Sequence, residues 1–288
     1  MQGGVGQSVV LGTKGNRQMG LIAFKLGAVT VYSYGLLILA ALVIFMLAAF
    51  VSVRLRHESF AVVADMLLWG LPLALILGRA GYVLHHFDYY ADALPSILAF
   101  WQGGYSFYGA LAGMLAAVLG VALVQGLPAW HWLDTLAPAG VLALVVVTFG
   151  VFVLQLNVGW ALPQDVPNDH TLMEYVESVY RPAGYEDTLY FQPIALYQSG
   201  LQLVAFALVT LLALVRGVLG RPRTDGCVFL LAVALVSFIR LGCGFYYLSS
   251  GIMAPSALPL GRLLSGGCGG LALLWMAVRL YSHRSVSV

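Results

Sequence analysis

Long apolar stretches with few charges recur along the chain. A bilayer core about 30 Å thick needs about 20 apolar helical residues to cross it. Seven segments meet this requirement: 28–53, 60–84, 106–126, 133–155, 193–215, 226–248 and 259–280. The pattern predicts an all-α integral membrane protein with seven transmembrane helices, in which residues 1–288 form a single transmembrane domain.

Composition agrees with a chain surrounded mainly by lipid. Apolar residues make up 61% of the 288 residues and charged residues only 9%, whereas a soluble domain is about 25% charged. The net charge is +2 without a basic block, so we expect no nucleic-acid partner. The three cysteines have no metal-ligand spacing, and the sequence predicts neither a metal nor a cofactor.

Positive charges indicate the orientation in the membrane, because cytoplasmic loops carry an excess of lysine and arginine. The connections after the first and fifth spans and the C-terminal tail carry these arginines: Arg54, Arg56, Arg216, Arg221, Arg223, Arg279 and Arg284. The opposite loops hold Arg181 and, in the N-terminal segment, Lys14, Arg17 and Lys25. We therefore expect the N-terminus outside and the C-terminus in the cytoplasm.

The longest outer loop, 157–191, is rich in tyrosine, proline and acid, including Glu174 and Glu177. Loops of this length are often functional lids, but aromatic residues also form belts at membrane interfaces. The sequence leaves both interpretations open.

Three arginines remain after those of the connections, loops and tail are counted: Arg79, Arg240 and Arg262. Arg240 lies about 14 residues into its span, roughly 21 Å from the inner end. The spans contain no carboxylate at the depth of these arginines, because Asp65 and Asp134 lie near the cytoplasmic ends of their own spans. An anionic ligand is therefore a natural partner, and a guanidinium group suits phosphate well. Snorkelling or bonds to backbone carbonyls explain Arg79 and Arg262 more readily than Arg240.

A polar segment that includes Gly103, Gly104, Ser106 and Tyr108 stands where the chain re-enters the membrane before the third span. Unwound backbone at membrane depth must line a cavity or be buried in protein. We therefore expect this segment to contribute to a site.

Six motifs occur in order along the chain: YGL at Tyr34, GRAGY at Gly78, WQGGYSFYG at Trp101, DTLAP at Asp134, Pro193 with Leu196-Tyr197, and FIR at Phe238. Together they resemble the prolipoprotein diacylglyceryl transferases, whose third-span motif is W-[DE]-G-G-[ML]-S-F-H-G. The resemblance implies a bacterial plasma (inner) membrane enzyme. Such an enzyme moves a diacylglyceryl group from phosphatidylglycerol to the thiol of a lipobox cysteine, forming a thioether.

The resemblance also implies a site. Arg240 matches the phosphate-holding arginine, Arg79 aligns with the G-R-x-G-Y motif, and Tyr34 and Gly104 match site positions. We predict a lipid-phosphate site made of these residues: Tyr34, Arg79, Gly103, Gly104, Ser106, Gln192, Tyr197 and Arg240. Tyr108 and Arg240 are the predicted catalytic residues. The expected partners are phosphatidylglycerol or another anionic phospholipid, and a prolipoprotein that contains a lipobox.

The chain departs from the family where chemistry is expected. Tyr32, Tyr108 and Gln192 stand in place of family histidines, and Gln198 replaces the glutamate of H-P-x-Q-L-Y-E. The fourth-span signature has Thr148 for its arginine and Val151 for its asparagine, and Gly244 replaces a sixth-span glutamate. A tyrosine with a pKa near 10 is a poor general base at neutral pH.

Three hypotheses follow. The first is an active transferase with rearranged catalytic residues. The second is a catalytically degenerate paralogue that still binds anionic phospholipid or a lipoprotein precursor. The third, a transporter, is disfavoured because the sequence has no inverted repeat.

Overall fold

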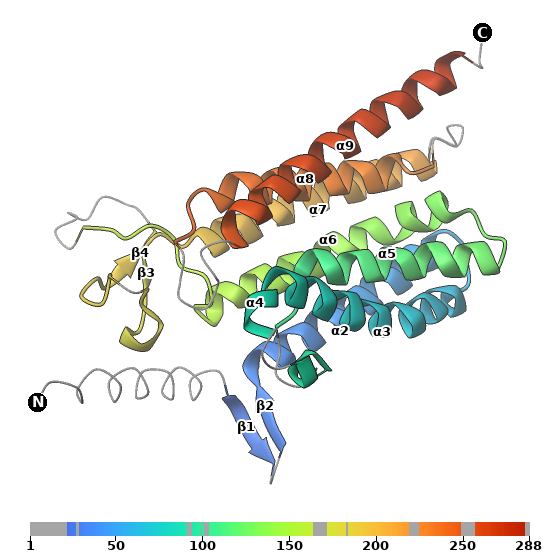
Figure 1. Cartoon of the computed structure of the whole chain (residues 1–288). Coiled ribbons are helices and arrows are strands. Elements are labelled where there is room, and N and C mark those ends of the chain that lie inside the picture. Colours follow the sequence, from blue (N-terminus) through green and yellow to red (C-terminus); the bar gives the residue numbers. More distant parts are fainter. Residues whose placement is uncertain are drawn as a thin grey trace, which may run out of the picture. The chain divides into compact units, whose positions relative to one another are not determined.

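The computed structural model describes residues 22–26, 29–90, 94–98, 100, 104–163, 172–182, 184–218, 225–248 and 257–285. Seven helices in these ranges are long and apolar enough to cross a membrane (Figure 1). They are α2 (Ser33–Leu55), α3 (Phe60–His85), α5 (Phe107–Val124), α6 (Ala129–Val153), α7 (Ile194–Val218), α8 (Cys227–Gly244) and α9 (Ala257–Ser285). The predicted all-α fold with seven spanning helices is confirmed.

The first span begins at Ser33 and not at residue 28, so the predicted start is wrong. The residues before it form a hairpin, in which β1 (Ile22–Leu26) pairs antiparallel with β2 (Val29–Tyr32). Val29, Thr30 and Val31 are β-branched and favour an extended backbone. Tyr32 therefore lies at the end of a strand, with its side chain exposed.

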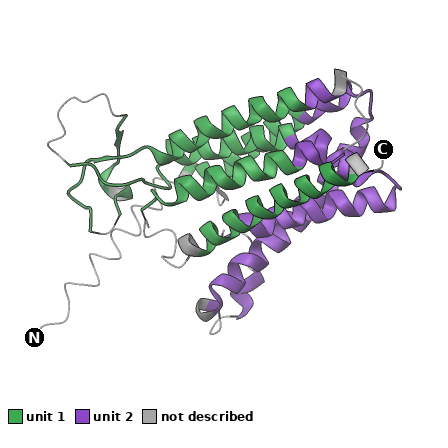
Figure 2. Ribbon diagram, turned by 90° about the horizontal axis from the view of Figure 1, so that it is seen from above, with its two compact units in different colours: residues 1–48, 138–212, 230–288 green, residues 49–137, 213–229 purple. Residues whose placement is uncertain are grey.

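Contacts between residues divide the chain into two compact units (Figure 2). Unit 1 comprises residues 1–48, 138–212 and 230–288, and unit 2 comprises residues 49–137 and 213–229.

In unit 2, α3 packs closely against α5 through glycines. A Cβ atom at Gly113 would lie 2.5 Å from the backbone carbonyl of Leu73, and one at Gly109 would overlap the carbonyl oxygen of Leu77. Small residues of this kind allow helix backbones to approach each other in membranes. The short helices α4 (Phe87–Tyr90) and η1 (Leu94–Leu98) connect α3 to the segment before α5.

Asp134 of the DTLAP motif caps a helix. Its Oδ2 accepts a hydrogen bond from the backbone N–H of Gly226 at 2.7 Å, and its Oδ1 accepts one from Phe229 at 2.8 Å. These N–H groups lie at the start of α8, where helical partners are lacking. The buried carboxylate of Asp134 therefore has a structural role. In the same unit His131 pairs with Glu58.

In unit 1, the described part of the outer loop forms a small β structure. Here β3 (Glu174–Tyr175) pairs antiparallel with β4 (Tyr190–Phe191), and η3 (Ser178–Tyr180) follows β3. Bridges join Ala161 to Phe191 and Gly159 to Tyr247. Val158, Val176 and Phe191 form its fully buried apolar core. The loop therefore has a folded core of its own.

Candidate functional site

Arg79 of α3 is only 2% exposed and is held by backbone carbonyls. Its Nε donates to Ile97 at 3.0 Å, its Nη2 to Ser96 at 2.7 Å, and its Nη1 to Gly104 at 3.4 Å. Its guanidinium carbon also lies 5.2 Å from the centre of the Tyr90 ring, a cation–π distance. Arg79 therefore fixes η1 and the segment before α5.

Residues 104–106 are not helical, and they pack against α3. Gly104 has φ +75, and a Cβ there would lie 2.7 Å from the Tyr82 ring and 3.0 Å from Nη1 of Arg79. The Ser106 N–H donates to the carbonyl of Gly78 at 2.8 Å. This arrangement agrees with the expectation that unwound backbone is buried against protein. Gly103 lies outside the described residues.

The first turn of α5 contains two more features of the motif. The Ser106 hydroxyl accepts a hydrogen bond from the Gly109 N–H at 3.3 Å and so caps the helix. Tyr108 follows, with its ring edge-to-face against Phe107 at 5.4 Å between centroids. Ser106 thus has a structural contact in addition to any contact with a ligand.

In unit 1, Arg240 of α8 lies within electrostatic range of two phenols, Tyr34 at the start of α2 and Tyr247 after α8. The Tyr247 hydroxyl donates to Oε1 of Gln198 on α7 at 3.0 Å. We call these four residues the Arg240 cluster. Burial raises the pKa of Tyr247, although Arg240 partly offsets this effect. Tyr247 is therefore a neutral hydrogen-bond donor at physiological pH.

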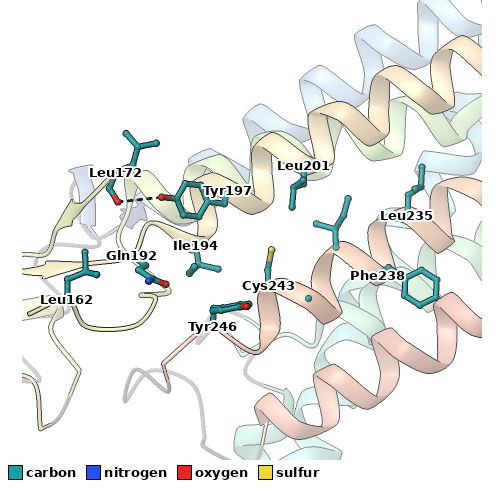
Figure 3. Close-up of a pocket in the computed structure, with 12 residues that line it drawn as sticks. Leu162, Leu172, Gln192, Ile194, Tyr197, Leu201, Leu235, Phe238, Cys243 and Tyr246 are labelled. Carbon is teal, nitrogen blue, oxygen red and sulfur yellow. Dashed lines mark hydrogen bonds between the residues drawn. The ribbon is translucent and has the colours of Figure 1, made fainter. Parts of the chain in front are cut away.

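A cavity of about 610 Å³ lies between α7 and α8 (Figure 3). Its walls are mostly apolar, with Leu201 on α7 and Leu235 and Ile239 on α8. Gln192 and Tyr197 contribute polar atoms to it. Two residues predicted from the sequence therefore line one cavity, and Ile239 immediately precedes Arg240 on the same helix.

Glu174 is a residue that sequence reasoning did not select. It is only 5% exposed, and neither carboxylate oxygen has a hydrogen-bond partner within the described residues. Burial raises the pKa of Glu174 to about 7. Its charge acts on Tyr247, which connects it to the Arg240 cluster. A loop carboxylate gives no short-range signal of burial, so the sequence alone places it among ordinary surface acids.

Gln202 is a second buried polar group of unit 1. It is fully buried, and its amide nitrogen and oxygen lack hydrogen-bond partners in the part of the chain that the structure describes. It stands four residues after Gln198 on α7, so the two amides share one helix face. Buried polar groups normally have partners, so these two amides place polar atoms in an otherwise apolar part of the unit.

The predicted residues divide between the units. Unit 2 contains Arg79, Gly104, Ser106 and Tyr108. Unit 1 contains Tyr34, Gln192, Tyr197 and Arg240.

Comparison with known proteins supplies the family. The family model described as prolipoprotein diacylglyceryl transferase matches residues 21–278. The chain belongs to this family. A prolipoprotein diacylglyceryl transferase family member with seven spanning helices is a multi-pass protein of the bacterial plasma membrane.

Curated relatives carry the name phosphatidylglycerol–prolipoprotein diacylglyceryl transferase. The one from Trichormus variabilis is 29% identical over 90% of this chain and 90% of its own length. The one from Bacillus velezensis is 29% identical over 90% of this chain and 91% of its own. A Listeria monocytogenes relative is 27% identical over 66% of this chain and 68% of its own.

Two of the departures from the transferase family pattern fall at the site in unit 1. Gln192, in place of a family histidine, lines the cavity. Gln198, in place of a glutamate, accepts the Tyr247 hydrogen bond. Both positions thus carry a neutral amide where the family motif has an ionisable side chain.

Proposed function

We propose that this protein transfers a diacylglyceryl group from phosphatidylglycerol to the thiol of a lipobox cysteine. The observation that carries the proposal is the position of Arg240. It lies in the spanning helix α8 within electrostatic range of the phenols of Tyr34 and Tyr247, and Cys243, three residues later on the same helix face, lines an apolar cavity. This combination suits a lipid with an anionic headgroup.

In this mechanism the Arg240 guanidinium binds the lipid phosphate. Charge develops on the phosphate oxygen that leaves, and a fixed cation in a site of low dielectric stabilises it strongly. Tyr34 adds a neutral hydroxyl donor, while the Tyr247 hydroxyl donates to Gln198. The cavity of about 610 Å³ is within the usual size range of small-ligand sites, and its apolar walls suit acyl chains.

Arg79 has a positioning role in the proposal. A guanidinium group has five N–H donors, and three different backbone carbonyls accept from Arg79. It therefore keeps residues 104–106 in place before α5, where Tyr108 and Ser106 lie.

The proposed orientation places the N-terminus and the 157–191 loop outside. This side follows from the excess of arginine at the opposite ends of the spans. Lipid and prolipoprotein would then reach the site from the outer leaflet.

The direct test is conversion of a lipobox peptide by the full chain in phosphatidylglycerol vesicles, with the thioether product detected by mass spectrometry. Arg240→Ala is expected to lower the rate by about 10²–10³-fold. Arg54→Ala is the matched control, because Arg54 is exposed and its guanidinium carbon lies over the Phe50 ring. Folded wild-type protein that makes no thioether would overturn the proposal.

A second candidate is a paralogue that binds phosphatidylglycerol without turnover. Tyr32, Tyr108 and Gln192 favour it, because each stands where the family has a histidine. It predicts lipid binding that Arg240→Ala weakens and no thioether from the wild type. Equal binding by both forms would exclude it.

A further inference from the structure

Unit 2 contains a second cavity, of about 700 Å³, which the proposed reaction does not use. The residues that line it follow α2, stand at the starts of α3, α6 and α8, or end α7. The ends of spanning helices lie at the depth of the lipid headgroups. In the orientation that the arginines predict, these ends face the cytoplasm, so this cavity belongs to the inner leaflet.

The turn between α2 and α3 brings two opposite charges to this cavity. The Glu58 N–H donates to the carbonyl of Val53 at 3.0 Å, and the His57 N–H donates to that of Arg54 at 3.2 Å. His57 has φ +56. This is the Schellman pattern, which ends a helix in a fixed conformation. Arg56 and Glu58, on either side of His57, both line the cavity.

Charges of both signs therefore surround the cavity. Arg216, at the end of α7, adds a second guanidinium group to that of Arg56. Asp225, before α8, adds a second carboxylate to that of Glu58. All four side chains are partly exposed, so a ligand can reach them. The carboxylate of Asp134 also lines the cavity, but it is occupied by the N–H groups at the start of α8.

The carboxylate of Glu58 keeps acceptor capacity for a ligand. His131, at the start of α6, pairs with its Oε1, whereas its Oε2 has no hydrogen-bond partner within the described residues. The Glu58 side chain is 20% exposed. An ionised carboxylate accepts hydrogen bonds only, and a primary ammonium group, with three N–H donors, is its complement.

Much of the remaining lining is apolar. It includes Val62, Leu127, Trp132 and Val228. A ligand that fits this cavity therefore needs an apolar part as well as charges of both signs. A phospholipid at the membrane interface has both, because its glycerol and the first carbons of its acyl chains lie next to its headgroup.

We propose that this cavity binds the headgroup of a zwitterionic phospholipid with a primary ammonium group, such as phosphatidylethanolamine. Arg56 and Arg216 bind the phosphate. Glu58 and Asp225 accept hydrogen bonds from the ammonium group. A choline headgroup has no N–H to donate, and an anionic headgroup would leave the two carboxylates without a cation. This site is distinct from the Arg240 cluster and does not depend on the transferase function.

The test titrates the purified full chain in detergent with phosphatidylethanolamine or phosphatidylcholine of identical acyl chains, and native mass spectrometry measures the bound lipid. The wild type is expected to bind phosphatidylethanolamine about tenfold more tightly. Arg56→Ala should weaken the binding of both lipids by about 5–10-fold. Arg54→Ala is the control, because Arg54 lies over the Phe50 ring and does not line the cavity.

Glu58→Gln should remove the preference for phosphatidylethanolamine and leave the binding of phosphatidylcholine unchanged. His131→Gln breaks the same ion pair but keeps the carboxylate, so the preference should persist. Asp225→Asn should reduce the preference without changing the Glu58–His131 pair.

Equal binding of the two lipids by the wild type, or an intact preference in both Glu58→Gln and Asp225→Asn, would overturn the ammonium site. Unchanged lipid binding in Arg56→Ala would overturn the phosphate site. Free O-phosphoethanolamine that binds as tightly as the lipid would assign the cavity to a soluble ligand and overturn the proposal of a phospholipid.

Discussion

Arg79 and Arg240 carry the same charge, but their guanidinium groups have different surroundings. Both arginines can be selected from the sequence, by their depth in the membrane and by the motifs in which they stand. Neither feature reveals that Arg79 donates to the carbonyls of Ser96, Ile97 and Gly104, because these bonds depend on the path of the chain after α3. Arg240 instead lies within electrostatic range of the phenols of Tyr34 and Tyr247.

Replacing Arg79 separates a positioning role from a phosphate-binding role. Lysine keeps the charge but loses the planar fork, so Arg79→Lys should lower the free energy of unfolding by about 1–3 kcal/mol, the scale of charged hydrogen bonds. Thermal unfolding in detergent and phosphatidylglycerol binding would be measured together. Unchanged stability with lost lipid affinity would show that Arg79 acts chiefly on the phosphate.

Glu174 should make stability depend on pH. Its folded-state pKa of about 7 exceeds the ordinary 4.5, so the folded protein binds this proton more tightly than the unfolded chain does. The stabilisation that Glu174 adds to the free energy of unfolding is fully present below pH 4.5 and is lost as pH rises to about 7. This loss is at most roughly 3 kcal/mol. Glu174→Gln should therefore gain stability relative to wild type between pH 5 and pH 8.

Melting temperatures of the wild type and of Glu174→Gln at pH 5 and pH 8 would measure this gain in stability. Glu177→Gln should follow the wild type, because Glu177 is exposed. A wild type and a Glu174→Gln variant that change equally with pH would contradict the raised pKa of Glu174.

At the scale of elements, the spanning helices are the most predictable part of the fold. Each is a local run of apolar residues whose length is fixed by the bilayer. The strands β3 and β4 are only two residues long and exist through pairing between residues 174–175 and 190–191. No local pattern encodes this pairing, and the burial of Glu174 depends on it, so this part of the site is not predictable from the sequence.

The contact of α3 with α5 should depend on Gly113. A Cβ at this position would lie 2.5 Å from the Leu73 backbone, and backbone cannot move aside as a flexible side chain does. Gly113→Ala should therefore destabilise the protein by about 1–3 kcal/mol, as overpacking does. Gly120→Ala in the same helix meets nothing within 4 Å and should be neutral or slightly stabilising. Equal melting temperatures for the two variants would contradict the close packing.

At the scale of the whole molecule, the family match spans residues 21–278, and the motif positions named above fall into two groups. Gly104, Ser106 and Gly109 keep the motif at the start of α5 and have packing or capping contacts that explain their residue types. Tyr108 and Gln192 depart from it where the family has histidines. Among these motif positions, those with packing or capping contacts keep the family residue, whereas Tyr108 and Gln192 do not, which is why the motif pattern predicts the fold better than the chemistry.

The predicted orientation has a test that is independent of activity. It begins with a functional chain in which the three cysteines, Cys227, Cys243 and Cys268, are replaced. One cysteine is then introduced either at Glu177 in the outer loop or at Tyr281 near the end of α9. Both side chains are exposed, so labelling reports the side of the membrane and not burial. A membrane-impermeant maleimide applied to intact cells should label Glu177→Cys, and it should label Tyr281→Cys only after the membrane is opened. The opposite pattern would place the 157–191 loop in the cytoplasm and would contradict the arginine-based orientation.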